Sequence, residues 1–195
     1  MIRVAILISG RGSNMASIVE AARDPAYPAK VALVLSNKPE ALGLRTAAEA
    51  GIPTAIVRHR DFASREDFDA EIGRLLAGHR IDLVALAGFM RILTPGFVES
   101  WRGRMLNIHP SLLPRYKGLD THARAIAAGD AEGGCTVHYV VPELDSGPVI
   151  AQERVPILPG DDPAALAARV LVAENALYPK ALAEVARGLR PKAGG

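Results

Sequence analysis

The alternation of continuous apolar runs with segments of helical periodicity constrains the fold most strongly. The runs are rich in β-branched residues, as in RVAILIS (3–9), KVALVLS (30–36) and DLVALAG (82–88), and shorter ones cover 54–58 and 104–109. Strands that are apolar at every position are buried on both faces, which is typical of parallel strands covered by helices. The sequence therefore predicts an α/β fold with a single doubly wound, mostly parallel sheet and helices on both faces.

Capping signals place helices between these strands. Ser64 and Asp67 resemble a capping box, and the pairs Thr94-Pro95 and Asp162-Pro163 are typical of an N-cap followed by a first helical residue. The predicted helices cover 14–23, 41–51, 65–79, 95–101, 120–129 and 163–187, and the segments CTVHYVV and PVIAQERVPI predict a late antiparallel strand pair. We expect one domain over residues 1–188 and a frayed tail at 189–195.

Composition and charge argue against several classes of function. The 195 residues carry a net charge of +2 with scattered basic residues, whereas a nucleic-acid groove needs a basic stripe with interleaved aromatics. The apolar run in MIRVAILISG is too short for a signal peptide, and no stretch reaches the length of a membrane span. The lone Cys135 fits a reducing compartment. We expect a cytoplasmic protein that acts on small molecules, without nucleic-acid or membrane partners, as a monomer or weak homodimer.

The glycine-rich turn SGRGSN (9–14) joins the first strand to the first helix. Its glycines let the backbone approach a ligand, and the N–H groups at the helix start attract an anion. A dinucleotide fingerprint needs a third glycine where Met15 stands and an acidic residue near Asn37. Both absences favour a terminal phosphomonoester over NAD, and the alternative is a turn that binds nothing.

Asn107 and His109 share one face of an apolar strand that ends at Pro110. One interpretation is an edge strand with a wet face. The other is a ligand site, because such sheets bind ligands at the carboxyl ends of their strands, where the glycine turn also lies. Asp145, in the turn between the two late strands, is expected to reach the same cleft.

Three segments carry a resemblance to a known family. The run NIHPSLLPRYKG (107–118), followed by ELDSGPVI (143–150) and preceded by AGFMRIL (87–93), resembles the folate-dependent formyltransferases, and the similarity extends from about residue 2 to about residue 185. The start ISGRGSN narrows the resemblance to members that act on a glycinamide ribotide. The resemblance implies transfer of a formyl group from the co-substrate 10-formyltetrahydrofolate to the amine of 5'-phosphoribosylglycinamide in purine (IMP) biosynthesis, without a metal.

The catalytic residues implied by the resemblance suit this chemistry. Attack by an amine on the formyl carbon creates an oxyanion, to which the amide of Asn107 and the ring of His109 can donate. Asp145 can hold the imidazole and favour its protonated form. Protons must also pass from the amine to the folate nitrogen, for which His109, Asp145 and water form a plausible relay.

The resemblance also implies the binding residues. Gly12, Ser13, Asn14 and Glu174 would hold the ribotide. The folate pocket would be formed by Arg65, Met90, Arg91, Ile92, Leu93, Val141, Pro142, Glu143 and Leu144, with Arg65 facing the carboxylate end of the folate. The alternatives are a solvated helix position for Glu174 and an ordinary N-terminal helix arginine for Arg65.

Two positions depart from the family pattern. The family enzyme has a histidine where Asp120 stands and a glutamine where Leu171 stands, and the second change weakens the assignment of the Glu174 helix to ribotide binding. Asp120 and His122 could mimic a pair of metal ligands, but a helix start explains them better, so no metal is expected.

The remaining histidines and the cysteine have simpler interpretations. His138 lies on the strand leading to Asp145, and its role stays open. His59 and His79 are expected at the surface, and Cys135 in the core.

Rival functions remain. The nearest alternative is another formyl-folate enzyme such as a deformylase, which would typically carry an N-terminal regulatory domain, whereas the sequence here begins directly at the first expected strand. A methionyl-tRNA formyltransferase needs a further C-terminal domain, and a sugar-amine formyltransferase has no use for the GRGSN turn. The alternative from a different class is a nucleotide-binding module without catalysis.

Overall fold

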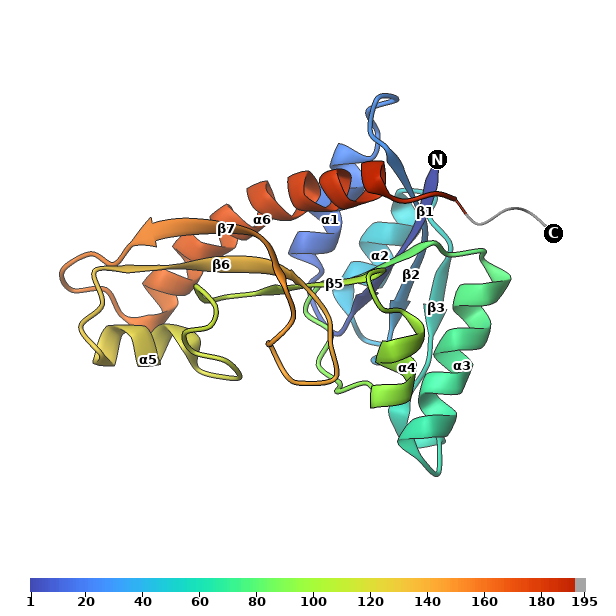
Figure 1. The fold of residues 1–195 in the computed structure, drawn as a ribbon, viewed down its shortest axis with the longest axis horizontal. Coiled ribbons are helices and arrows are strands. Elements are labelled where there is room, and N and C mark those ends of the chain that lie inside the picture. Colours follow the sequence, from blue (N-terminus) through green and yellow to red (C-terminus); the bar gives the residue numbers. More distant parts are fainter. Residues whose placement is uncertain (192–195) are drawn as a thin grey trace.

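A seven-stranded sheet forms the centre of the molecule, which is described here by a computed structural model over residues 1–191 (Figure 1). The strands are β1 (Ile2–Ile8), β2 (Ala29–Ser36), β3 (Thr54–Ile56), β4 (Leu83–Leu86), β5 (Met105–His109), β6 (Glu132–Tyr139) and β7 (Val149–Pro156). They lie in the order β3-β2-β1-β4-β5-β6-β7. The first five in this order are parallel, and β6 is antiparallel to both β5 and β7. The predicted α/β fold with a late antiparallel strand pair is confirmed.

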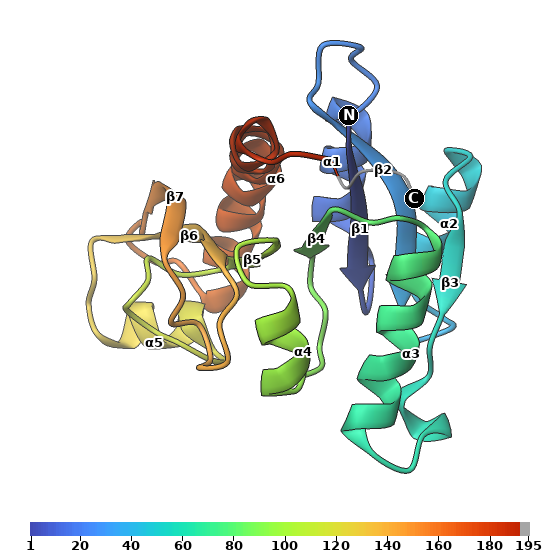
Figure 2. The same ribbon diagram turned by 45° about the vertical axis from the view of Figure 1, so that its right-hand side comes forward.

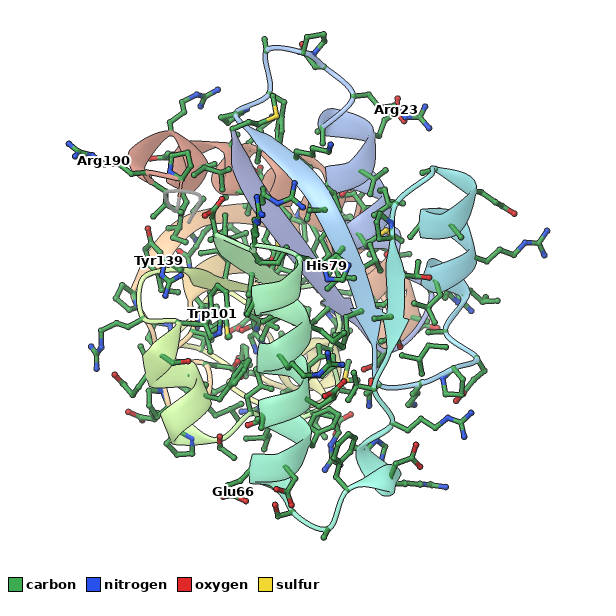
Figure 3. All side chains as sticks on the ribbon, turned by 90° about the vertical axis from the view of Figure 1, so that its right-hand side faces the viewer. Arg23, Glu66, His79, Trp101, Tyr139 and Arg190 are labelled. Atoms are coloured by element: carbon green, nitrogen blue, oxygen red, sulfur yellow. The ribbon has the colours of Figure 1, made fainter. Side chains whose placement is uncertain are left out.

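Helices cover both faces of the sheet (Figures 1 and 2). They are α1 (Ser13–Ala21), α2 (Leu42–Glu49), α3 (Arg65–Gly78), α4 (Pro95–Ser100), α5 (Thr121–Ala127) and α6 (Pro163–Gly188). One core packs α1, α2 and α6 against the sheet, and a second core packs α3 and α4 against the opposite face. Figure 3 looks onto this second face, where α3 runs from Glu66 at one end to His79 at the other. No helix within residues 1–191 has the length and apolarity needed to cross a membrane.

The predicted helix starts are confirmed by their capping bonds. Ser64 accepts the N–H of Asp67, Thr94 accepts the N–H of Phe97, and Asp162 accepts the N–H of Ala165. Each bond satisfies one of the backbone donors that a helix start leaves unpaired. The last helix ends at Gly188, and of the predicted tail at 189–195, residues 192–195 lie outside the described part of the chain.

The interpretation of β5 as a wet edge strand is wrong. β5 lies between β4 and β6, and Leu106 and Ile108 pack in the core beneath α6. On the other face His109 is only 6% exposed. An interior strand that nevertheless carries an amide and an imidazole needs another explanation, because buried polar groups cost free energy unless they have partners.

The sixth strand begins earlier than the sequence predicts. It starts at Glu132 and passes through Gly133 and Gly134 before reaching Cys135. Gly134 has φ +156°, and a Cβ there would overlap the carbonyl oxygen of Glu153 on β7. The expected strand CTVHYVV leaves out these two glycines, whereas Gly134 here lies within the strand and lets β6 and β7 approach closely.

Cys135 should be inert in the folded protein. Its side chain is fully buried in the core beneath α6, and burial, with a smaller contribution from the Glu174 carboxylate, raises the pKa of the thiol to about 12. Because the thiolate is the reactive form, a disulfide-exchange reagent at pH 7–8 should label the native protein only as fast as the protein unfolds. Rapid labelling at the rate seen in denaturant would contradict the core assignment.

Candidate active site

The carboxyl ends of β1, β4 and β5 meet where the strand order reverses. β1 lies between β2 and β4, so the chain leaves β1 and β4 toward opposite faces, which opens a crevice at their ends. Four loops border it: the anion turn (9–14), the pocket loop (87–94), the histidine loop (110–120) and the aspartate loop (140–148).

Asn107 is held by His138, which stands opposite it in the antiparallel pair of β5 and β6. Asn107 Nδ2 lies 3.3 Å from His138 Nε2, and His138 Nδ1 lies 2.9 Å from the carbonyl oxygen of Tyr139. Because a carbonyl only accepts, Nδ1 carries the proton and Nε2 accepts one amide hydrogen of Asn107. Burial lowers the pKa of His138, which keeps this ring neutral. The second amide hydrogen of Asn107 is left for a ligand.

Both ring nitrogens of His109 face acceptors. Nε2 lies 2.9 Å from the carbonyl oxygen of Tyr116, and Nδ1 lies 3.4 Å from Asp145 Oδ2. A carbonyl and a carboxylate both accept, so the imidazolium with two N–H groups matches these surroundings best. The geometry therefore suits a ring that stabilises negative charge or passes on a proton.

Asp145 stands between the two histidines on the aspartate loop. Its Oδ2 also accepts the N–H of Gly118 at 2.9 Å, and its Oδ1 lies 3.9 Å from His138 Nε2. Asp145 has φ +48°, in the left-handed region that Asp and Asn adopt more readily than most residues. The fold thus brings Asp145 to His109, as the sequence predicts, and both groups take a backbone partner from the histidine loop.

A pocket of about 130 Å³ adjoins Asn107 and Asp145. Its walls come mainly from the pocket loop and the aspartate loop, and they include six of the predicted folate residues: Arg91, Ile92, Leu93, Val141, Pro142 and Leu144. The side chains of Met90 and Glu143 do not line it. Met90 is 67% exposed, and the side chain of Glu143 is 80% exposed.

A second, polar groove of about 190 Å³ adjoins this pocket and shares Arg91 and Ile92 with it. It contains the last predicted folate residue, Arg65, together with His59 and Ser64. Arg91 Nε is buried and has no hydrogen-bond partner within residues 1–191. Burial lowers the pKa of His59, and the nearby charges of Arg91, Arg60 and Lys38 lower it further. Positive charge therefore gathers here, which suits a carboxylate.

The anion turn leads into α1 and packs closely against Gly43. Gly12 has φ +74°, and a Cβ there would lie 3.0 Å from Gly43 Cα, so the position excludes a side chain. No side chain caps α1, whose first residues are Ser13 and Asn14. Uncapped N–H groups and the helix dipole together favour a bound anion.

Asn14 and Glu174 meet although they are 160 residues apart in the chain. Asn14 Nδ2 donates to Glu174 Oε2 at 2.9 Å, while Asn14 Oδ1 is buried without a partner in the described chain. Burial raises the pKa of Glu174, and the bond from Asn14 partly offsets that effect. Glu174 is 8% exposed, so the alternative of a solvated helix position is wrong.

Residues 2–182 match the formyl transferase family. The chain belongs to this family. It is 46% identical over 185 residues to the phosphoribosylglycinamide formyltransferase of Escherichia coli (strain K12), covering 95% of this chain and 87% of that protein. The crystal structure of phosphoribosylglycinamide formyltransferase from Brucella melitensis matches with a TM-score of 0.92 and 48% identity, covering 98% of this chain and 99% of that one.

A larger relative contains a similar segment. The trifunctional purine biosynthetic protein adenosine-3 of Drosophila melanogaster is 53% identical over 188 residues, which are 95% of this chain but only 14% of that protein. The formyl transferase chain therefore spans about a seventh of that relative.

Sequence reasoning missed several partners in this formyl transferase. Tyr116 contributes its backbone carbonyl and Gly118 its backbone N–H. Every non-proline residue has both groups, so the residue type gives no sign of these roles. His138 is placed opposite Asn107 by the register of the antiparallel pair, which the sequence alone does not give. His59 and His79, expected at the surface, are half-buried, and each ring lies at hydrogen-bond distance from a partner.

The two departures from the family pattern lie at the surface. Asp120 is exposed, has φ +56° and precedes α5 without a side-chain capping bond. Leu171 is 38% exposed on α6. Within residues 1–191, no group of three His, Cys, Asp or Glu side chains is arranged to hold a metal ion.

Proposed function

We propose that this chain transfers the formyl group of 10-formyltetrahydrofolate to the amine of 5'-phosphoribosylglycinamide, a step of de novo purine biosynthesis. One observation carries the proposal: the amide of Asn107 and the pair His109 and Asp145 share a crevice with an apolar pocket and an uncapped helix start. Formyl transfer from formyl-tetrahydrofolate is the reaction of this family.

Asn107 would stabilise the charge that develops in the reaction. The substrate amine adds to the formyl carbon, and the carbonyl oxygen becomes an oxyanion. His138 fixes one amide hydrogen of Asn107, so the other can point at this oxygen without reorganisation of the site. A donor that is already oriented when charge develops contributes more than one that must first rotate.

His109 and Asp145 would transfer the protons of the reaction. The attacking amine must lose a proton, and the folate N10 must gain one as its bond to the formyl carbon breaks. Asp145 lies near both His109 and His138, so a proton released at the amine has a carboxylate and an imidazole within reach. This scheme uses only side chains and water, and no step in it requires a metal.

The two substrates would enter from opposite sides. The ribotide phosphate would bind at Gly12, Ser13 and the start of α1, with Asn14 and Glu174 next along the ribotide. The folate ring would lie in the pocket of about 130 Å³, and its carboxylate end would reach Arg65 and Arg91 in the polar groove. We expect a monomer or weak homodimer acting on small molecules.

The test is a formyl-transfer assay with purified protein. We expect 10-formyltetrahydrofolate to lose its formyl group only when glycinamide ribonucleotide is present, with formylated ribotide appearing at the same rate. Omitting the ribotide tests for a deformylase, which would release formate to water. Formate release without ribotide, or no turnover with both substrates, would overturn the proposal.

Inorganic phosphate should compete with the ribotide and not with the folate. The anion turn and the start of α1 form the expected phosphate site, and the polar groove around Arg65 is separate from it. Inhibition by phosphate is measured against each substrate in turn, with potassium chloride at equal ionic strength as the control for screening. Competition against the folate alone would mean that phosphate does not bind at the anion turn, and it would contradict this prediction.

A further inference from the structure

A buried pair of polar side chains joins three strand ends beside the pocket. Ser9 follows β1 and is 7% exposed, and Asn37 follows β2 and is 2% exposed. The Ser9 hydroxyl donates to Asn37 Oδ1 at 2.5 Å and accepts the backbone N–H of Met90 at 2.8 Å. The mechanism above uses neither side chain, and the pair binds no substrate in it.

The pocket loop depends on this contact because of where Met90 lies. Its neighbours Phe89 and Arg91 line the pocket, whereas the Met90 side chain itself points to solvent. The hydrogen bond from the Met90 N–H to Ser9 thus ties this part of the loop to the folded core. At the far end of the loop, the buried carboxylate of Asp69 on α3 accepts the N–H of Thr94 at 2.7 Å.

Asn37 in turn sets the direction of the Ser9 hydroxyl. A serine hydroxyl has one hydrogen, and here the Asn37 oxygen takes it, which leaves a lone pair for Met90. Asn37 Nδ2 lies 3.4 Å from His59 Nδ1. Burial and, after it, the nearby cations lower the pKa of His59, which favours the neutral ring that can accept a hydrogen from the Asn37 amide.

We propose that Ser9, oriented by Asn37, is a positioning residue that holds the pocket loop in the shape that receives the folate. The contact spans 81 residues of chain and ties the loop to the end of β1, where the anion turn begins. The kinetic test of this inference rests on the proposed function. The structural test needs only the protein without substrates.

The kinetic test uses Ser9→Ala, Asn37→Ala and the double variant. A typical hydrogen bond contributes about 0.5–1.5 kcal/mol, so the KM for 10-formyltetrahydrofolate should rise about 3- to 10-fold in Ser9→Ala. The KM for the ribotide and the kcat at saturation should stay within about twofold, since no catalytic group is moved. The double variant should be no worse than Ser9→Ala, because Asn37 acts through Ser9.

The structural test follows hydrogen exchange of the Met90 amide by NMR. Exchange should be faster in Ser9→Ala than in the wild type, and unchanged in the control Ser100→Ala, whose exposed hydroxyl donates to Phe97 on α4. If the wild type fails to transfer formyl groups, the proposed function fails, while the exchange experiment still tests the contact.

Three outcomes would overturn the inference. The first is an unchanged Met90 exchange rate. The second is a lower melting temperature in Ser9→Ala with both KM values unchanged or raised equally, which would mean a purely structural role. The third is additive effects of the two substitutions, which would mean that Asn37 does not act through Ser9.

Discussion

Replacing Asp145 by asparagine should slow formyl transfer by about 10²–10⁴-fold, the range typical of a lost acid–base group. The carboxylate lies 3.4 Å from His109 Nδ1 and 3.9 Å from His138 Nε2, so it is the only charge that the site offers to both rings within residues 1–191. Asparagine removes that charge and retains one oxygen acceptor. The ring of His109 loses the negative charge beside it, and the proposed proton relay loses its carboxylate.

The asparagine variant is also the one that should fold normally. Asparagine tolerates the left-handed backbone at φ +48°, and its side-chain oxygen can still accept the N–H of Gly118. We therefore expect a melting temperature close to that of the wild type and a ribotide affinity, measured by calorimetry, within a few-fold of it.

The matched control for this variant is Asp161→Asn. Asp161, in the segment between β7 and α6, is paired with Arg169 on α6, and neither residue lines the pocket or the polar groove, so its substitution should leave turnover unchanged. If Asp145→Asn instead loses stability while turnover per folded molecule is kept, Asp145 is a structural residue of the aspartate loop and not part of the relay.

Replacing Asn107 by alanine should lower kcat by about 10²–10³-fold, the cost of one oxyanion donor. Asn107 Nδ2 is the amide donor on the β5 side of the pocket, and His138 already holds one of its two hydrogens. Alanine cannot donate, so the developing charge faces only His109 and water. The substitution does not touch the proposed ribotide site at α1, and calorimetry should show ribotide binding close to that of the wild type.

A second variant separates the donor from the shape of the side chain. Asn107→Asp keeps the size of the residue but places oxygen where the donor stood, and its charge repels the oxyanion. Its activity should be no higher than that of the alanine variant. Near-wild-type turnover in either variant would remove Asn107 from the chemistry.

The kinds of element and most of their ends follow from local sequence. Local effects define the apolar runs of β1, β2 and β4 and the helix starts at Ser64 and Thr94. Because these effects act over a few residues, they can be predicted from the sequence. The presence of Asn107 and His109 on one strand face is likewise a consequence of the two-residue repeat. The misread start of β6 shows the limit, because Gly134 is in the strand for a reason that lies on β7.

Which of these residues meet was decided only by the tertiary structure. The chain itself determines the apolar runs, the caps and the shared face of Asn107 and His109. It does not determine which distant residues meet. These contacts include the hydrogen bonds of Asn14 with Glu174, of Met90 with Ser9 and of Asn107 with His138. These contacts depend on strand order and on register across β5 and β6, which are set by packing of the whole sheet. The partners of His109 and Asp145 on the histidine loop are backbone groups, which are alike at nearly every position, so only the folded chain can select Tyr116 and Gly118.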